Sequence, residues 1–154
     1  MRPESRGTIA LASADPTAAP KIVSNYLAVE ADRRVLLDGM KLVRRTTAQP
    51  AFAQHVVREH LPGPEATSNE ALMAYARAYA TTVFHPCGTC KMGSDPNAVV
   101  DARLKVHGIA GLRIADASIM PTMTSGNTNA PTIMIGEKAA DMIRQDARIA
   151  AQAA

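Results

Sequence analysis

The stretch from Thr82 to Pro131 most constrains how this chain of 154 residues can fold, because Gly, Pro, Asn and Asp interrupt it too often for a long helix or strand. One short apolar run within it, "LRIAD" from Leu112 to Asp116, predicts a buried strand. The loop "ASIMPTMTSGNTNA" follows this run and leads to Pro131. Any chemistry in this half of the chain must therefore be carried largely by side chains in turns and loops.

Regular elements are expected on both sides of this stretch. The hydrophobic spacing predicts a strand over 7–13, an amphipathic helix over 29–46, a second helix over 50–61, a third helix from Thr67 and a last helix behind Pro131. The third helix has a start signal, since Thr67-Ser68-Asn69-Glu70 matches a capping box. Pro131 suits the first turn of the last helix, and the Ala-rich residues 147–154 are expected to fray.

Composition and charge exclude several classes of protein. The chain is 47% hydrophobic and 20% charged, as in an ordinary folded protein. Its 17 Lys and Arg against 14 Asp and Glu are dispersed, which does not favour a nucleic-acid partner. No apolar run approaches the roughly 18 residues of a membrane span, and the amino terminus lacks the apolar core of a secretion signal. With two cysteines, no disulfide framework is expected, and a cytoplasmic location is predicted.

The segment "FHPCGTCKMGSDPNAVVD" can support three different chemistries. His85, Cys87 and Cys90 are zinc-ligand types at close spacing, but structural zinc normally takes four ligands and no second pair follows. The C-x-x-C spacing also suits a thiol redox couple, or two small buried thiols that pack a tight turn. His85 could act as a general base, because imidazole titrates near neutral pH, or as a structural hydrogen-bond donor. The residues alone leave these alternatives open.

Three ordered blocks carry a resemblance to a known family: "HPCGTCKMG", "AVVDARLKVHGIAGLRIADASIMP" and "SGNTNAPTIMIGEKAADMI". They resemble the carboxyl-terminal region of glucose–methanol–choline (GMC) oxidoreductases, especially the choline dehydrogenase-like and alcohol dehydrogenase-like branch. The first half, from "RPESRG" to "GMKLVR", is similar to that family's entry into its substrate-binding part. Family members bind FAD and oxidise an alcohol to an aldehyde or ketone by hydride transfer to the flavin. The resemblance thus implies FAD as cofactor and a small alcohol as substrate.

The resemblance also implies roles for individual residues. His85 matches the family's catalytic histidine and would accept the hydroxyl proton of the substrate. Asn127 matches the second active-site position, which is histidine in some members and asparagine in others, and would hydrogen-bond the developing alkoxide. Two further residues match a segment near the phosphate and ribityl part of the cofactor, and four match the stretch against the isoalloxazine ring: Asp116 and Ala117, then Thr128, Asn129, Pro131 and Thr132. No metal ligand is implied.

One part of the family pattern is absent: neither G-x-G-x-x-G nor G-x-x-x-x-G-K-[ST] occurs in this chain. We therefore expect the carboxyl-terminal fragment of such an enzyme, whose partner is the missing amino-terminal FAD-binding portion. The alternative is a catalytically inactive fragment or an interaction module.

The expected fold is α+β, a partial two-domain GMC oxidoreductase fold that lacks the amino-terminal Rossmann part. Residues 1–107 would belong to the substrate-binding domain, and 108–146 would supply the last strand and helix of the FAD-binding domain, with 147–154 as a tail. Apolar surface left without its neighbours would favour self-association.

Overall fold

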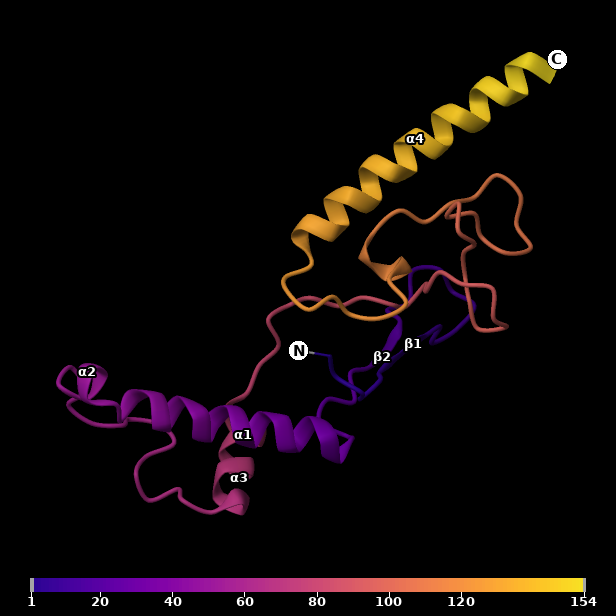
Figure 1. Ribbon diagram of the computed structural model, residues 1–154. Helices are drawn as coiled ribbons and strands as arrows, with labels where there is room; N and C mark the ends of the chain where they lie inside the picture. The colour runs from indigo at the N-terminus through magenta and orange to yellow at the C-terminus, as the bar shows by residue number, and fades with distance from the viewer. Residues whose placement is uncertain (1, 154) are drawn as a thin grey trace. The chain divides into compact units, whose positions relative to one another are not determined.

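The computed structural model describes residues 2–153, and its chain divides into two compact units (Figure 1). Residues 4–83 form the amino-terminal unit. Residues 84–153, joined by residues 2–3, form the carboxyl-terminal unit. Of the helices within residues 2–153, none combines the length and the hydropathy that a membrane crossing requires.

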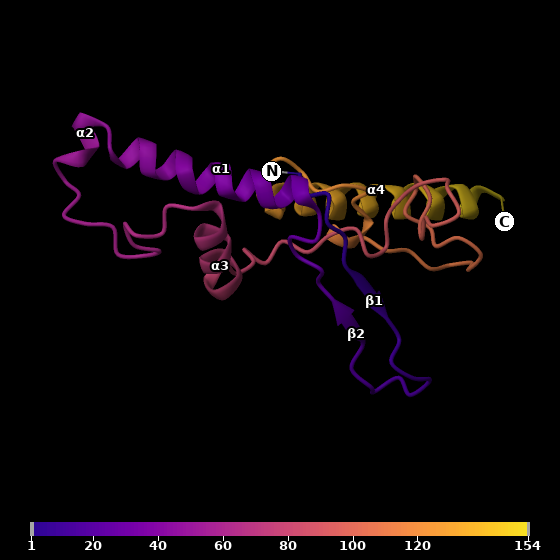
Figure 2. The same cartoon turned by 90° about the horizontal axis from the view of Figure 1, so that it is seen from below.

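The amino-terminal unit begins with a two-stranded antiparallel sheet. Strand β1 (Thr8–Ala10) pairs with β2 (Lys21–Val23), as Figure 2 shows. Ile9 lies opposite Ile22. All six residues are exposed. The strand predicted over 7–13 is therefore present but shorter, and β2 was not predicted, because three residues are too few for a visible alternation.

Helix α1 (Glu30–Thr47) confirms the amphipathic helix predicted over 29–46. The helix predicted over 50–61 is wrong beyond its first turn, because α2 covers only Pro50–Ala53. The chain after α2 wraps around the side chain of Arg44 instead. The Arg44 guanidinium donates to Glu59 Oε1 at 2.8 Å and to the carbonyl oxygens of residues 63 and 66 at 2.9 and 2.7 Å. Hydrogen bonds from the Arg44 guanidinium to this segment take the place of the backbone hydrogen bonds of a helix. A local hydrophobic pattern does not reveal such bonds, because Arg44 lies outside the segment.

Helix α3 (Asn69–Tyr79) confirms the third predicted helix. Its N-cap is Ser68, one residue later than the box beginning at Thr67 implied, and Ser68 Oγ accepts the N–H of Ala71 at 3.1 Å. One face of α3 is buried and contacts α1; its buried residues are Leu72, Met73 and Ala76. This face is the core of the amino-terminal unit.

The carboxyl-terminal unit contains the longest helix, α4 (Asn129–Ala153). Pro131 lies in its first turn, as predicted, whereas the tail expected to fray is helical through Ala153. Ile135 and Ala139 are the buried residues of α4. They pack in one apolar cluster with residues of the preceding loops: Val100, Leu104, Ile119 and Met120.

The strand predicted over 112–116 is wrong, since this segment makes only an isolated bridge between Arg113 and Lys105. Similar single bridges join Val100 to Met92 and to Val106. Turns separate the bridging residues, so no pairing continues for a second step. Backbone hydrogen bonds are still made, but they come from irregular loops instead of from a ladder.

A cluster of opposite charges holds α4 to the loop residues 103–113. Asp146 on α4 accepts from Arg103 Nη2 at 2.7 Å and from Lys105 Nζ at 2.8 Å, and it also pairs with Arg113. These hydrogen bonds, first from Lys105 and then from Arg103, lower the pKa of Asp146 to about 2. The carboxylate therefore favours the folded state only while it is ionised.

We expect Asp146→Asn to lower the midpoint of thermal unfolding at neutral pH by about 3 °C, because three cations lose their shared anion. The folded-state pKa lies below the unfolded value of 3.8, so the stability due to this carboxylate is present above about pH 4 and is lost as the pH falls toward 2. As the pH is lowered from 4 to 2, the thermal unfolding midpoint measured by circular dichroism should thus fall more steeply for the wild type than for Asp146→Asn. Asp141→Asn, on an exposed carboxylate of the same helix, is the control. Equal midpoints for the two variants at neutral pH would contradict the role of Asp146.

Candidate active site

The loop that follows His85 is bound to a second loop through its backbone. The N–H groups of Gly88, Cys90 and Met92 donate to the carbonyl oxygens of residues 117, 118 and 119, at 3.4, 3.0 and 2.8 Å. These bonds recur at every second residue on one side, as they would along a strand edge. The segment that begins at His85 is therefore held in register against residues 117–119.

Gly88 allows the two loops to approach each other. Its φ angle is +85°, a backbone conformation that residues with a side chain rarely adopt. A Cβ atom at this position would also lie 3.2 Å from the carbonyl oxygen of Met120. The turn after His85 therefore requires glycine.

The second loop is shaped by Asp116. Residues Ala117–Ile119 form one 3₁₀ turn, η1, and Asp116 Oδ1 caps this turn by accepting the N–H of Ser118 at 2.7 Å. Asp116 is exposed, and Ala117 packs half-buried against the apolar cluster. The structure thus places the two predicted cofactor-contacting residues directly beside the loop of the predicted catalytic histidine.

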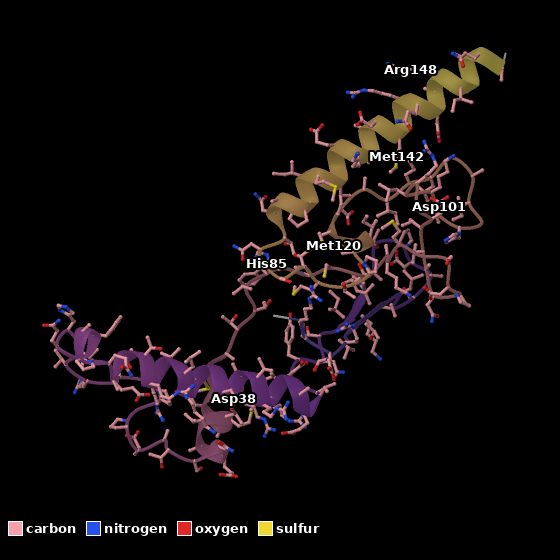
Figure 3. All side chains as sticks on the ribbon, viewed as in Figure 1. Asp38, His85, Asp101, Met120, Met142 and Arg148 are labelled. Carbon is pink, nitrogen blue, oxygen red and sulfur yellow. The ribbon has the colours of Figure 1, made fainter. Side chains whose placement is uncertain are left out.

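The side chain of His85 contacts the start of α4 (Figure 3). Thr128 Oγ1 lies 3.2 Å from His85 Nδ1, and Thr128 is buried, with 8% of its surface exposed. His85 itself is half-buried. The carbonyl oxygen of Thr128 accepts both the N–H and the hydroxyl of Thr132, at 3.0 and 2.6 Å. The contact on the histidine is thus anchored in the first turn of the helix.

The remaining predicted residues lie around this contact. Asn127 is exposed, and its Cα is about 3.8 Å from that of Thr128 across one peptide. Asn129 is exposed, whereas Pro131 and Thr132 are half-buried in the first turn of α4. The structure brings the neighbourhood of Asn127 to His85. Within residues 2–153 the Asn127 side chain makes no hydrogen bond, and its role stays a prediction.

Neither Cys87 nor Cys90 is part of a disulfide. Both side chains are half-buried, and Cys87 packs against the apolar cluster. Within residues 2–153, no three His, Cys, Asp or Glu side chains are grouped so that they could hold a metal ion.

Sequence reasoning missed two features of this site. The sequence assigned Thr128 to the flavin and not to His85. The available signal was Pro131, three residues later, which has no N–H that the Thr128 hydroxyl could accept as a helix cap. Sequence reasoning also did not single out Gly88, whose conformation is visible only once the loops are paired.

Comparisons with known proteins agree on one family. The GMC oxidoreductase family model matches residues 3–136. The chain is 51% identical over 144 residues to the oxygen-dependent choline dehydrogenase of Chromohalobacter salexigens, a match that covers 94% of this chain and 26% of that enzyme. The chain therefore belongs to the GMC oxidoreductase family. It spans about a quarter of the length of the curated relatives it matches.

Solved structures of this family superpose well on the chain. Pyridoxine 4-oxidase from Mesorbium loti matches with a TM-score of 0.86 and 33% identity, over 94% of this chain and 28% of that protein. A formate oxidase of Aspergillus oryzae RIB40, studied for its FAD modification, matches with a TM-score of 0.80 and 33% identity, over 91% of this chain and 25% of that protein. The mixed helix and sheet content expected from the sequence is thus found in a GMC oxidoreductase fold.

We expect Gly88→Ala to destabilise the chain by roughly 1–2 kcal/mol, because alanine resists a positive φ angle. Urea unfolding followed by circular dichroism measures the change. Gly136→Ala is the matched control: Gly136 lies within α4, and an added Cβ would meet no atom within 4 Å beyond the adjacent residues and the nearby helix backbone, so alanine should stabilise the chain by about 0.5–1 kcal/mol. Stabilisation by both substitutions would show that the turn at Gly88 is not constrained.

Proposed function

We propose that this chain is the carboxyl-terminal part of an FAD-dependent alcohol oxidoreductase that converts a CH–OH group to a carbonyl. It supplies the residues that handle the proton, and an amino-terminal portion supplies most of the FAD-binding surface. The observation that supports this most is the contact of His85 with Thr128. Thr128 directly follows Asn127 in the sequence, so this contact brings the imidazole close to the backbone of Asn127. These are the two positions to which the family resemblance assigns the chemistry.

The proposed reaction divides the two hydrogens of the alcohol. His85 accepts the hydroxyl proton, and the carbon-bound hydrogen leaves as hydride, so that the C–O bond becomes a carbonyl. Bound FAD supplies the acceptor for this hydride. The Asn127 amide donates a hydrogen bond to the oxygen as negative charge develops on it.

The start of α4 is chemically suited to lie near the flavin. Its first turn contains no acidic residue, so the partial positive charge of the helix end is not neutralised locally. Hydroxyl and amide side chains are present there on Thr128, Asn129 and Thr132, together with Pro131. These residues would contact the isoalloxazine ring of the flavin. The partial positive charge of the helix end would then favour negative charge on the reduced flavin.

The rest of the cofactor would be held in part by Asp116 and Ala117. Most of the phosphate-binding energy must come from a Gly-rich turn that this chain does not contain. In this proposal residues 1–107 belong to the substrate-binding domain, and residues 108–146 complete the FAD-binding domain. The chemical class of the substrate is a small alcohol, and choline is the first to test because the relatives are named for it.

The proposal predicts that this chain completes a truncated relative. We expect the chain alone to show neither flavin absorbance nor alcohol oxidation. A chimera, in which the chain replaces the matching carboxyl-terminal quarter of the Chromohalobacter salexigens enzyme, should bind FAD and show flavin bleaching by choline. The same relative truncated before the matched region is the control. Turnover by the isolated chain with added FAD would overturn the proposed need for the amino-terminal portion.

In that chimera, His85→Ala should lower kcat by roughly 10² to 10⁴, because the substrate proton loses its acceptor. Stopped-flow measurement of flavin reduction by choline reports the affected step directly. His55→Ala provides the control, since His55 is exposed and belongs to the other unit. A rate unchanged by His85→Ala would remove His85 from the mechanism.

A further inference from the structure

Thr128 occupies the N-cap position of α4 but does not cap it in the usual way. The helix begins at Asn129, and the Thr128 carbonyl oxygen accepts the N–H of Thr132. An N-cap hydroxyl ordinarily accepts the N–H of the second or third helical residue. The third residue here is Pro131, which has no N–H. The second residue, Ala130, has an N–H, but among the described residues it does not donate to the Thr128 hydroxyl, which is therefore available for another partner.

Helix α3 of the same chain shows the ordinary arrangement. Its N-cap, Ser68, accepts the N–H of Ala71, the third helical residue, at 3.1 Å. The corresponding hydroxyl on α4 lies instead 3.2 Å from His85 Nδ1. In the described part of the chain this is the one hydrogen bond that the Thr128 hydroxyl makes, although the side chain is buried and has little access to water.

The contact distinguishes the two nitrogens of the imidazole. With Nδ1 bound to Thr128, Nε2 is the nitrogen left to meet a substrate. A hydroxyl that accepts from Nδ1–H keeps Nε2 unprotonated in the neutral ring, and it can keep accepting after Nε2 has taken a proton. A hydroxyl that donates to Nδ1 would instead require Nε2–H, which cannot accept a proton from an alcohol.

We propose that Thr128 is a positioning residue for His85: its hydroxyl accepts a hydrogen bond from Nδ1–H and leaves Nε2 as the atom that takes the substrate proton. This inference rests on the proposed function of His85 as general base. In this role Thr128 acts on the reaction through His85, in addition to its proposed contact with the flavin. Its backbone is fixed for this task by Thr132, which donates twice to the Thr128 carbonyl oxygen.

Substitutions of Thr128 in the chimera test this role. Thr128→Val keeps the shape of the side chain but removes the hydroxyl, and should lower kcat about 10- to 100-fold, as expected for a lost hydrogen bond to a charged group. KM should change by less than about threefold, because substrate binding does not use this hydroxyl. Thr128→Ser retains the hydroxyl and should restore kcat to within about threefold of the wild type.

Thr124→Val is the matched control. It removes a hydroxyl from the same loop, one that donates to the carbonyl oxygen of Gly126 and not to histidine. We expect kcat to be unchanged. A fall as large as that of Thr128→Val would show that loss of any hydroxyl in the loop disturbs the site, and would overturn the specific role of Thr128.

The tautomer of His85 gives a second measurement, made on this chain itself. Nitrogen NMR at a pH where the imidazole is neutral should show His85 protonated at Nδ1, with the signal assigned by its loss in His85→Ala. Thr128→Val should shift the population toward Nε2–H. The wild-type spectrum tests the inference even if Thr128→Val does not fold.

The outcomes separate the inference from the proposed function. If His85→Ala lowers turnover as expected but the wild-type ring carries its proton on Nε2, or Thr128→Val matches the wild type, the inference is wrong and the proposed role of His85 stands. If His85→Ala retains full turnover, the inference and the proposed role of His85 are both wrong.

Discussion

The backbone hydrogen bonds between the loop after His85 and residues 117–119 are the constraint on which the carboxyl-terminal unit depends. This unit has no regular sheet among its described residues, and buried N–H and C=O groups must still find partners. Bonding at every second residue supplies those partners and joins two distant stretches of sequence. The apolar cluster includes Ile119 and Met120 from one of the loops, and Cys87 and Met92 from the other loop pack against it.

Helix α4 is held differently at its two ends. Near its carboxyl end, Asp146 pairs with three cations from a single loop region. At its amino end, Thr128 offers a hydroxyl to His85, and no acidic side chain occupies the first turn. The ionic cluster and the buried residues Ile135 and Ala139 therefore fix the helix, which leaves its first turn available for the site.

The exposed apolar side chains are consistent with a chain that spans about a quarter of the length of its relatives. Its relatives are about four times as long, and large hydrophobic residues are exposed in both units, among them Leu11 at 88% and Ile149 at 64%. In the proposed function these side chains would pack against the FAD-binding portion. The predicted self-association follows from the same exposure and stays a prediction.

The sequence by itself determined the features that depend on neighbouring residues. The periodicity of α1, the polar start signal of α3 and the proline in the first turn of α4 each involve residues a few positions apart, although the cap of α3 is Ser68 and not Thr67. Family membership came from ordered motifs in the sequence. The roles of His85 and Asn127 rest on the same motifs and stay predictions.

Only the tertiary structure decided the features that join distant residues. His85 and Thr128 are 43 residues apart, and Arg103 and Asp146 are also 43 apart, so no local pattern records either contact. The same reason explains the errors: the loop around Arg44 shortened α2, and the turns between single bridges prevented a strand over 112–116. Local preference sets where an element begins, whereas hydrogen bonds and charges brought together by folding decide whether it continues and what its side chains touch.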